Sequence, residues 1–125
     1  MASSQTATLV SFLPTAVDIC LSRGDNPTIP VAVTSDAVAV DITGATFIMT
    51  VDPAPDPTDN TANLFSVTGV INGAPTLGLV DFTPTVVDTD QLPSTYFYDI
   101  EMVHPTIGRR TILKGKFIIS QEITK

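Results

Sequence analysis

The side chains that most often carry catalysis are scarce in this 125-residue sequence, which has one histidine, His104, and one cysteine, Cys20. A catalytic triad needs a histidine beside a nucleophile and an orienting acid, and no nucleophile-elbow motif is present. One histidine and one cysteine also cannot form a conventional zinc site. We interpret His104, which precedes Pro105, as a turn residue and Cys20 as an outward-facing, unreactive thiol. The sequence therefore predicts no enzyme, no catalytic residue and no cofactor.

Arg23, Gly24 and Asp25 form the tripeptide that integrin ligands display on exposed loops. Here the tripeptide lies where two alternating segments must reverse direction. Glycine supplies a positive φ, and Asp25 and Asn26 can hydrogen-bond back to the turn backbone. A turn accounts for all four residues of RGDN, whereas an adhesion signal accounts for only three. We therefore interpret the stretch as a turn.

The stretch DPAPDPTDN, residues 52–60, contains three aspartates that could supply oxygen ligands to calcium: Asp52, Asp56 and Asp59. Calcium loops hold about six to eight oxygens in a tight bend, typically with a glycine at the turn. This stretch has no glycine and is stiffened by prolines. We therefore predict a solvated connector with no bound metal.

Strand patterns dominate the rest of the chain. Ten prolines are spread through it, which disfavours long helices, and apolar residues alternate with polar ones in short segments. Many of the apolar positions are β-branched, which is typical of short strands separated by turns. The only plausible helical turn lies in residues 83–94.

The two longest alternating segments, residues 95–103 and 110–119, flank the turn-forming stretch HPTIGR. We predict an antiparallel hairpin, because one register aligns apolar residues on its inner side and opposite charges on its outer side. The inner pairs are Ile100 with Leu113, Met102 with Thr111, Tyr98 with Gly115 and Tyr96 with Phe117, and the outer pairs are Asp99 with Lys114 and Phe97 with Lys116.

Two further hairpins are predicted on the same grounds. Residues 63–71 would pair with residues 76–82, placing Val67 opposite Val80, and residues 17–21 would pair with residues 29–33. Between these hairpins the chain turns at Thr43 and Gly44. About seven strands at this spacing predict an all-β fold, a two-layer antiparallel sandwich. Four residues that follow the turn at Thr43 and Gly44 should point into the core of the sandwich: Ala45, Phe47, Met49 and Val51.

A chain of this length is expected to form one domain. We assign residues 13–125 to a single β-sandwich domain and residues 1–12 to an N-terminal arm, which contains the apolar residues Leu9, Val10 and Phe12. A short arm can add a strand to the open edge of a neighbouring sheet. We therefore expect these three residues to take part in protein contacts.

Four apolar residues fall on the outer side of the predicted hairpin: Phe97, Val103, Ile112 and Ile118. If exposed to water, they would form a hydrophobic patch that favours association, and we interpret this patch as a surface that binds another protein chain. The alternative is a sheet that is covered on both faces, so that both of its sides are apolar.

The charge is unevenly distributed: thirteen acids oppose six bases, and five of the bases lie in residues 109–125. An acidic surface repels phosphate, so we expect no nucleic acid partner. No apolar run approaches the ~20 residues that cross a bilayer, so we expect no membrane contact. The uneven charge could orient neighbouring copies in an assembly, or it could simply keep the domain soluble.

Several motifs, taken in order, resemble a known family. They are RGDN, DITGATF, an acidic loop, a glycine-containing hairpin, QLPSTYFYDI and GKFII. Over about residues 13–122 the sequence is similar to the N-terminal domain of phage baseplate upper proteins. The resemblance implies an immunoglobulin-like β-sandwich and a virion structural protein that is assembled in the bacterial host cytoplasm. It implies no catalytic residues.

The expected function is accordingly structural. We expect an oligomeric tail or baseplate adaptor or assembly module, a homo-oligomer such as a trimer or ring that contacts other virion proteins. A capsid decoration (cement) protein is the first alternative. A carbohydrate-binding sandwich is a further alternative, but the chain has no tryptophan and both tyrosines face inward in the predicted register.

Overall fold

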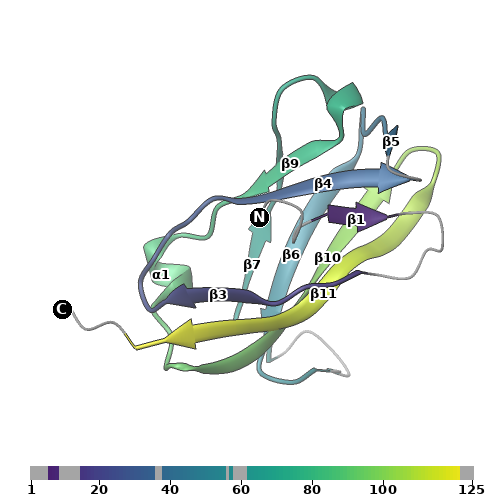
Figure 1. The fold of residues 1–125 in the computed structure, drawn as a ribbon. Coiled ribbons are helices and arrows are strands. Elements are labelled where there is room, and N and C mark those ends of the chain that lie inside the picture. Colours follow the sequence, from purple (N-terminus) through teal and green to yellow (C-terminus); the bar gives the residue numbers. More distant parts are fainter. Residues whose placement is uncertain (1–5, 9–14, 36–37, 56, 58–61, 122–125) are drawn as a thin grey trace.

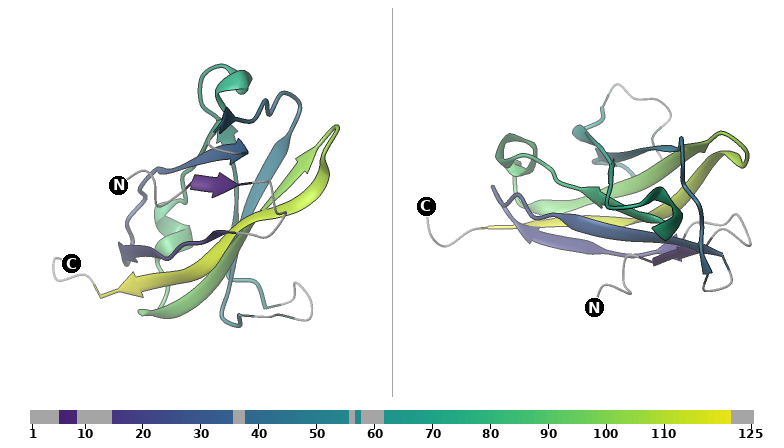
Figure 2. Two further views of the ribbon diagram at one scale, coloured as in Figure 1. Left: turned by 45° about the vertical axis from the view of Figure 1, so that its right-hand side comes forward. Right: turned by 90° about the horizontal axis from the view of Figure 1, so that it is seen from above.

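The computed structural model describes residues 6–8, 15–35, 38–55, 57 and 62–121. In this part of the chain the strands form two sheets packed face to face, which confirms the predicted all-β sandwich (Figures 1 and 2). The five-stranded sheet has the order β1-β4-β9-β8, with β5 also on β4, and the six-stranded sheet has the order β2-β11-β10-β6-β7, with β3 also on β11. Two short helices, η2 and α1, lie in the connections before β9 and β10.

The bounds of the five-stranded sheet are β1 (Thr6–Thr8), β4 (Ile29–Ser35), β5 (Val38–Ala39), β8 (Val70–Ile71) and β9 (Leu79–Phe82). Those of the six-stranded sheet are β2 (Thr15–Ala16), β3 (Ile19–Ser22), β6 (Thr46–Asp52), β7 (Phe65–Thr68), β10 (Ser94–His104) and β11 (Gly108–Ser120). The helices are η2 (Pro75–Leu77) and α1 (Val86–Thr89).

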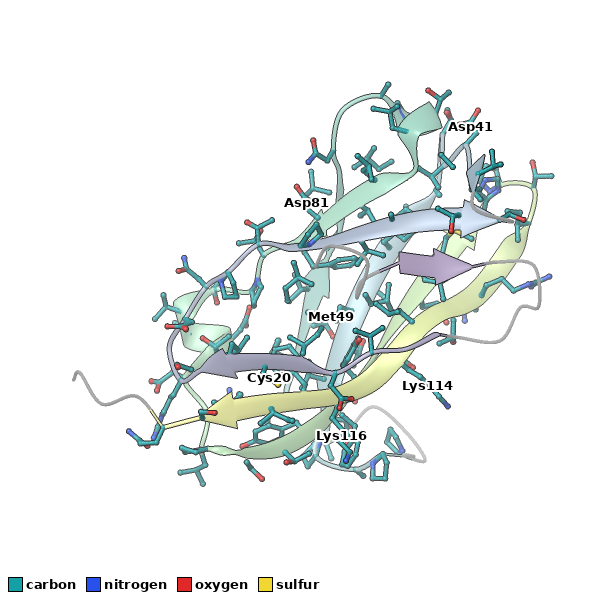
Figure 3. The ribbon with its side chains drawn as sticks, in the orientation of Figure 1. Cys20, Asp41, Met49, Asp81, Lys114 and Lys116 are labelled. Carbon is teal, nitrogen blue, oxygen red and sulfur yellow. The ribbon has the colours of Figure 1, made fainter. Side chains whose placement is uncertain are left out.

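The core lies between the two sheets and follows the alternation of the strands. On β6 the inward residues Phe47, Met49 and Val51 are buried, and Ala45 just before the strand is buried as well, as predicted. Met49 lies in the interior of the sandwich (Figure 3). Fully burying one large apolar side chain stabilises the fold by about 1.5–3 kcal/mol. The facing sheet contributes the buried residues Ile29, Val31, Val33, Val80 and Phe82.

Strands β10 and β11 form the predicted hairpin, and its register is confirmed over most of its length. Tyr98 lies opposite Gly115, and Ile100 lies opposite Leu113. The tyrosine hydroxyl donates a 2.5 Å hydrogen bond to the carbonyl oxygen of Val17, next to β2. The ring of Tyr98 also meets Phe117 edge to face, with centroids 6.3 Å apart. These contacts tie the hairpin to the edge of its own sheet.

Past Ile100 the register shifts by one residue, because β11 contains a β-bulge. Glu101 lies opposite Thr111 and Met102 opposite Arg110, so the predicted pairing of Met102 with Thr111 is wrong. The extra residue, Ile112, turns inward beside Leu113 and is only 1% exposed. The prediction that Ile112 lies on the outer side is therefore also wrong, since strict alternation cannot anticipate an inserted residue.

The predicted hairpin between residues 63–71 and 76–82 does not form as such. Strand β7 pairs with β6 in the six-stranded sheet, whereas β8, which begins after Gly69, pairs with β9 in the other sheet. The chain changes sheets at Gly69, where an added Cβ would lie 2.8 Å from side-chain atoms of both Phe82 and Val80. Only a residue without a side chain lets the strand cross so close to the core, and Val67 therefore faces Met49 instead of Val80.

Residues 17–21 and 29–33 do not pair with each other, so this predicted hairpin is also wrong. The residues that were expected to point inward on these two segments do so. Strand β3 pairs in parallel with β11, and β4 pairs with β9, so the RGDN turn links the two sheets. Ile19 and Val31 are both buried because they approach one core from opposite sides. An alternating pattern identifies the inward face of a strand but not its neighbour.

The described part of the N-terminal arm is a strand. Residues 6–8 form β1, which pairs in parallel with Ala32, Val33 and Thr34 of β4 in the same chain. Strand β1 thus covers part of an edge of the five-stranded sheet (Figure 1). Backbone groups of β4 that would otherwise form an open edge are paired over these three positions.

Candidate protein-contact surface

The outer face of the six-stranded sheet, which points away from the core, carries several apolar side chains. Phe97 and Ile118 lie there, half-buried, and Val103 is 41% exposed. Ile48 on β6 adds a fourth apolar residue and is 40% exposed. Glu101 on the neighbouring strand β10 lies directly opposite Ile48, so Val103, two residues further along β10, is the diagonal neighbour of Ile48. Phe97, Val103 and Ile118 therefore lie on the expected face, and their role in a contact stays a prediction.

A shallow hollow lies on this outer face where β6, β7 and β10 meet. Ile48 and Val103 form the apolar part of the hollow. The charged Glu101 lies opposite Ile48 and two residues before Val103 on β10. Phe47 adds to the lining at the start of β6, although its side chain is buried and points into the core. We call this site the hollow and define it by its lining residues, Thr46, Phe47, Ile48, Thr68, Glu101 and Val103.

The outward positions of β10 and β11 bring together three of the six bases of the chain. Arg109, Lys114 and Lys116 lie there beside the acids Asp99 and Glu101. Figure 3 labels the two lysines. The guanidinium Nε of Arg109 lies 3.7 Å from a carboxylate oxygen of Glu101, an exposed ion pair worth little by itself. Desolvation raises the pKa of Asp99, and repulsion from Glu101 raises it further, while Lys114 opposes the shift. The face therefore carries three bases against two acids in a chain that is otherwise acidic.

A second exposed apolar group lies at the opposite end of the sandwich, on and just after α1 (Figure 1). Val86 is 52% exposed, Val87 is 79% exposed and Leu92 is 71% exposed. We call these three residues the knob. The sequence-based prediction placed a helical turn here, which is confirmed, but it did not single out these residues. Their signal was modest: three large apolar side chains within seven residues of a polar connection.

Hydrogen bonds hold the knob in place. Thr85 and Asp88 form a capping box, in which each side chain accepts from the backbone N–H of the other residue at 3.1 Å and 2.9 Å. The hydroxyl of Thr89 donates to the carbonyl oxygen of Asp25 at 2.6 Å. The hydroxyl of Tyr96 donates to the carbonyl oxygen of Leu92 at 2.5 Å. These bonds order a connection that has too few residues to be a stable helix alone.

The RGDN stretch is a turn, as predicted. Gly24 has a positive φ of 84°, and the carboxylate of Asp25 accepts a 3.3 Å hydrogen bond from the backbone N–H of Ser22. The guanidinium Nε of Arg23 donates to the carboxylate of Asp90 at 2.9 Å, which joins the turn to the segment after α1. The side chain of Arg23 is therefore engaged in an ion pair within the same chain.

The remaining chemical candidates take structural positions. His104 ends β10 next to the hairpin turn, and Cys20 faces outward from β3 with an exposed thiol (Figure 3). Asp52 is buried, and its Oδ1 accepts a 2.8 Å hydrogen bond from the N–H of Ala54. Asp56 and Asp59 lie outside the described residues. Across the described residues, no three His, Cys, Asp or Glu side chains gather as a metal site would require.

Other expectations fall partly or wholly outside the structure. Leu9, Val10 and Phe12 are not among the described residues, so their predicted contacts stay predictions. The inward placement of both tyrosines is confirmed, since Tyr96 and Tyr98 are buried. No aromatic side chain in the described part of the chain is fully exposed as a sugar-binding platform would be. None of the described helices is long and apolar enough to cross a membrane.

Comparison with known proteins finds likeness in fold only. None of the family models searched matches the chain, and none of the curated proteins compared is a match. Among solved structures, the N-terminal domain of phage TP901-1 ORF48 is similar with a TM-score of 0.54 and 8% identity, covering 92% of this chain and 94% of that one. At this identity the likeness shows a shared fold, which is the fold that the sequence resemblance predicted.

A second solved structure is AggA, the major subunit of aggregative adherence fimbriae type I from Escherichia coli. It covers 86% of this chain and 91% of its own, with 9% identity and a TM-score of 0.36. At that TM-score the likeness carries no argument about fold or function.

Proposed function

We propose that this chain is a structural protein of a bacteriophage virion that works by contacting other virion proteins and carries out no catalysis. The observation that carries the proposal is the shared fold with a domain of a phage protein over nearly the whole of both chains. The sequence resemblance to baseplate upper proteins points in the same direction and favours an adaptor or assembly module of the tail or baseplate. Capsid decoration is the alternative location within the particle.

The surface of the sandwich supports a role in assembly. Large apolar side chains are exposed at both ends, in the knob and around the hollow, and such side chains in water favour association. The edge of β4 offers a second means of contact, because it accepts a strand from the N-terminal arm. Three of the described residues pair there, and such a short pairing lets the arm leave its own edge and pair with another.

Removing the arm in a phage that encodes the chain tests this proposal. We expect that a chain lacking residues 1–12 still folds, because the core side chains of both sheets are retained, but is absent from purified particles. The matched control lacks only residues 1–5 and keeps β1, so it should be incorporated normally. Mass spectrometry of the purified particles measures both.

Two results would contradict the proposal. One is normal incorporation of the chain that lacks residues 1–12, which would remove the role of the arm. The other is absence of the full chain from particles, which would remove the virion role altogether. Imaging of intact particles at side-chain resolution then separates the tail or baseplate from the capsid.

A further inference from the structure

Asn72 and Gly73 begin the connection that leads from β8 to β9, and both residues are exposed. An asparagine that precedes a glycine can react within its own chain, because the backbone nitrogen of the second residue can attack the side-chain carbonyl carbon of the first. Glycine hinders this attack least, since it has no Cβ. The connection therefore brings an electrophile and a nucleophile together where water reaches both.

The backbone N–H of Gly73 is available for this reaction. Among the residues that the structure describes, no atom accepts a hydrogen bond from it. Gly73 also has a φ of 75°, a conformation that residues with a side chain rarely adopt. The fold therefore requires a glycine after Asn72, and the reactive pair cannot be replaced at this position without backbone strain.

The other two asparagines in the described part of the chain lack this combination. Asn26 precedes Pro27, which has no backbone N–H. Asn63 precedes Leu64, whose N–H already donates to the carbonyl oxygen of Val51 at 2.7 Å. These two asparagines are therefore internal controls for the reactivity of Asn72.

The side chain of Asn72 has a partner that gives the reaction a structural consequence. Its amide nitrogen Nδ2 donates a 3.0 Å hydrogen bond to the carboxylate Oδ2 of Asp81 on β9, which is labelled in Figure 3. The backbone N–H of Asn72 donates to the carbonyl oxygen of Leu79 at 2.9 Å. If the amide became a carboxylate, the donor to Asp81 would be lost and two negative charges would face each other.

We propose that Asn72 is a site of spontaneous deamidation that loosens the edge of the five-stranded sheet. The backbone nitrogen of Gly73 gives its proton to solvent and forms a bond to Cγ of Asn72. The bond from Cγ to Nδ2 then breaks, and ammonia leaves. Water opens the resulting cyclic imide at either of its two carbonyl groups and leaves aspartate or isoaspartate. The overall reaction consumes one water and releases one ammonia, without an oxidant or a reductant.

The change falls on a weakly held strand. Strand β8 is at the end of the five-stranded sheet, and its two residues pair with β9, the strand that carries Asp81. Each modification also adds one negative charge to a chain whose net charge is already −7. The inference goes beyond the proposed function and does not depend on it, because the reaction requires neither a virion nor a second protein.

Incubation of the purified full chain in mildly alkaline buffer tests the reactivity, since loss of the amide proton of Gly73 starts the reaction. Peptide mapping by mass spectrometry distinguishes an amide from an acid at each asparagine. We expect Asn72 to be modified at least about tenfold faster than Asn63, because glycine leaves the attacking nitrogen unhindered. The matched control is Asn72→Gln, which keeps an amide donor but must close a larger ring, so this position should stay unmodified.

A pair of variants tests the structural consequence. Asn72→Asp supplies one product of the reaction directly and should raise the equilibrium constant for unfolding by about tenfold, through the lost hydrogen bond and the repulsion from Asp81. Adding Asp81→Asn to this variant restores a donor facing an acceptor and should recover most of the loss. Urea unfolding measures both variants beside the unaltered chain.

Three results would overturn the inference. The first is modification of Asn63 as fast as that of Asn72. The second is an Asn72 that stays intact in the folded chain over a time in which it is fully modified in urea, which would show that the fold protects it. The third is a double variant no more stable than Asn72→Asp, which would remove Asp81 from the consequence.

Discussion

The imidazole Nε2 of His104 lies 2.9 Å from the backbone carbonyl oxygen of Asp41 and joins the tip of the β10–β11 hairpin to the turn before β6. The other ring nitrogen, Nδ1, accepts hydrogen bonds from the backbone N–H groups of Thr106 and Ile107 at 3.0 Å and 3.1 Å. Nδ1 therefore carries no proton, and Nε2 is the donor to Asp41. The only histidine of the chain thus shapes one turn and fastens it to another.

Replacing His104 should separate these two roles. His104→Ala loses the bonds on both ring nitrogens, and at about 1 kcal/mol for each net hydrogen bond we expect a loss of about 2–3 kcal/mol in the free energy of unfolding. His104→Asn keeps an acceptor oxygen near the turn and should lose about half as much. Urea unfolding measures both. Equal losses would show that the hydrogen bonds within the turn contribute nothing.

Gly115 should tolerate no side chain. An added Cβ would lie 2.1 Å from the carbonyl oxygen of Val17, which is backbone and also accepts the hydrogen bond of Tyr98. Gly115→Ala must therefore displace the segment that joins β2 to β3, at a cost of about 3 kcal/mol or more. The free energy of unfolding from urea titration measures this cost.

Gly24→Ala is the matched control for this steric effect. Nothing lies within 4 Å of its added Cβ, but its φ of 84° is unfavourable for alanine. The expected cost is about 1–2 kcal/mol, from backbone strain alone. If Gly24→Ala were as damaging as Gly115→Ala, the steric account of Gly115 would be wrong.

The side chain of Asp41 should contribute stability at neutral pH but not in acid. Its Oδ1 accepts hydrogen bonds from the hydroxyl and the N–H of Thr43 at 2.6 Å and 3.0 Å. These bonds lower the pKa of Asp41 below its ordinary value of 3.8. Because the pKa of Asp41 is lower in the folded state, ionisation of its carboxyl group stabilises the fold. This stabilisation is present above the ordinary pKa of 3.8 and is lost as the pH falls through the lower pKa of the folded state.

Asp41→Asn should therefore be less stable than the unaltered chain near pH 7, and the difference should shrink at low pH. Urea midpoints for both proteins between about pH 7 and pH 2.5 test this expectation. A difference that stayed constant across the range would mean that the carboxylate charge has no part in the turn.

The sequence led us to interpret Cys20 as an unreactive thiol, but its exposure in the structure predicts that a reagent can reach it in the folded protein. The side chain points outward from β3 and is exposed, so a neighbour does not cover it. We expect a thiol reagent such as dithionitrobenzoate to modify Cys20 in the native chain within about tenfold of its rate in urea, because access is not the limiting factor. Protection by a factor of a thousand would contradict this exposure, unless it disappeared on dilution and so pointed to a contact between copies.

The contact surface was only partly predictable from the sequence. The outward phase of Phe97, Val103 and Ile118 followed from the hairpin register, because each strand residue points away from its neighbours. Ile48 was missed, since it lies outward on a different strand and becomes a neighbour of Val103 only through the pairing of β6 with β10. The knob was missed because short connections have no periodic pattern from which an exposed apolar group can be recognised.

What the sequence alone determined is local. Alternation along a strand follows from the pleat of the backbone, so the inward positions of Phe47, Met49 and Tyr98 could be predicted before any partner strand was known. The turns at RGDN and at Thr43-Gly44 were equally local, since a positive φ at glycine and short polar side chains suffice for them.

Apart from the β10–β11 hairpin, only the tertiary structure decided which strands are neighbours. Backbone hydrogen bonds are chemically the same for every residue, so the sequence carries no label that sends β3 to β11 and β4 to β9. The bulge at Ile112 and the change of sheet at Gly69 were likewise settled by packing. In each case the chain departs from strict alternation where two distant segments must fit around one core, and that fit exists only once both sheets are in place.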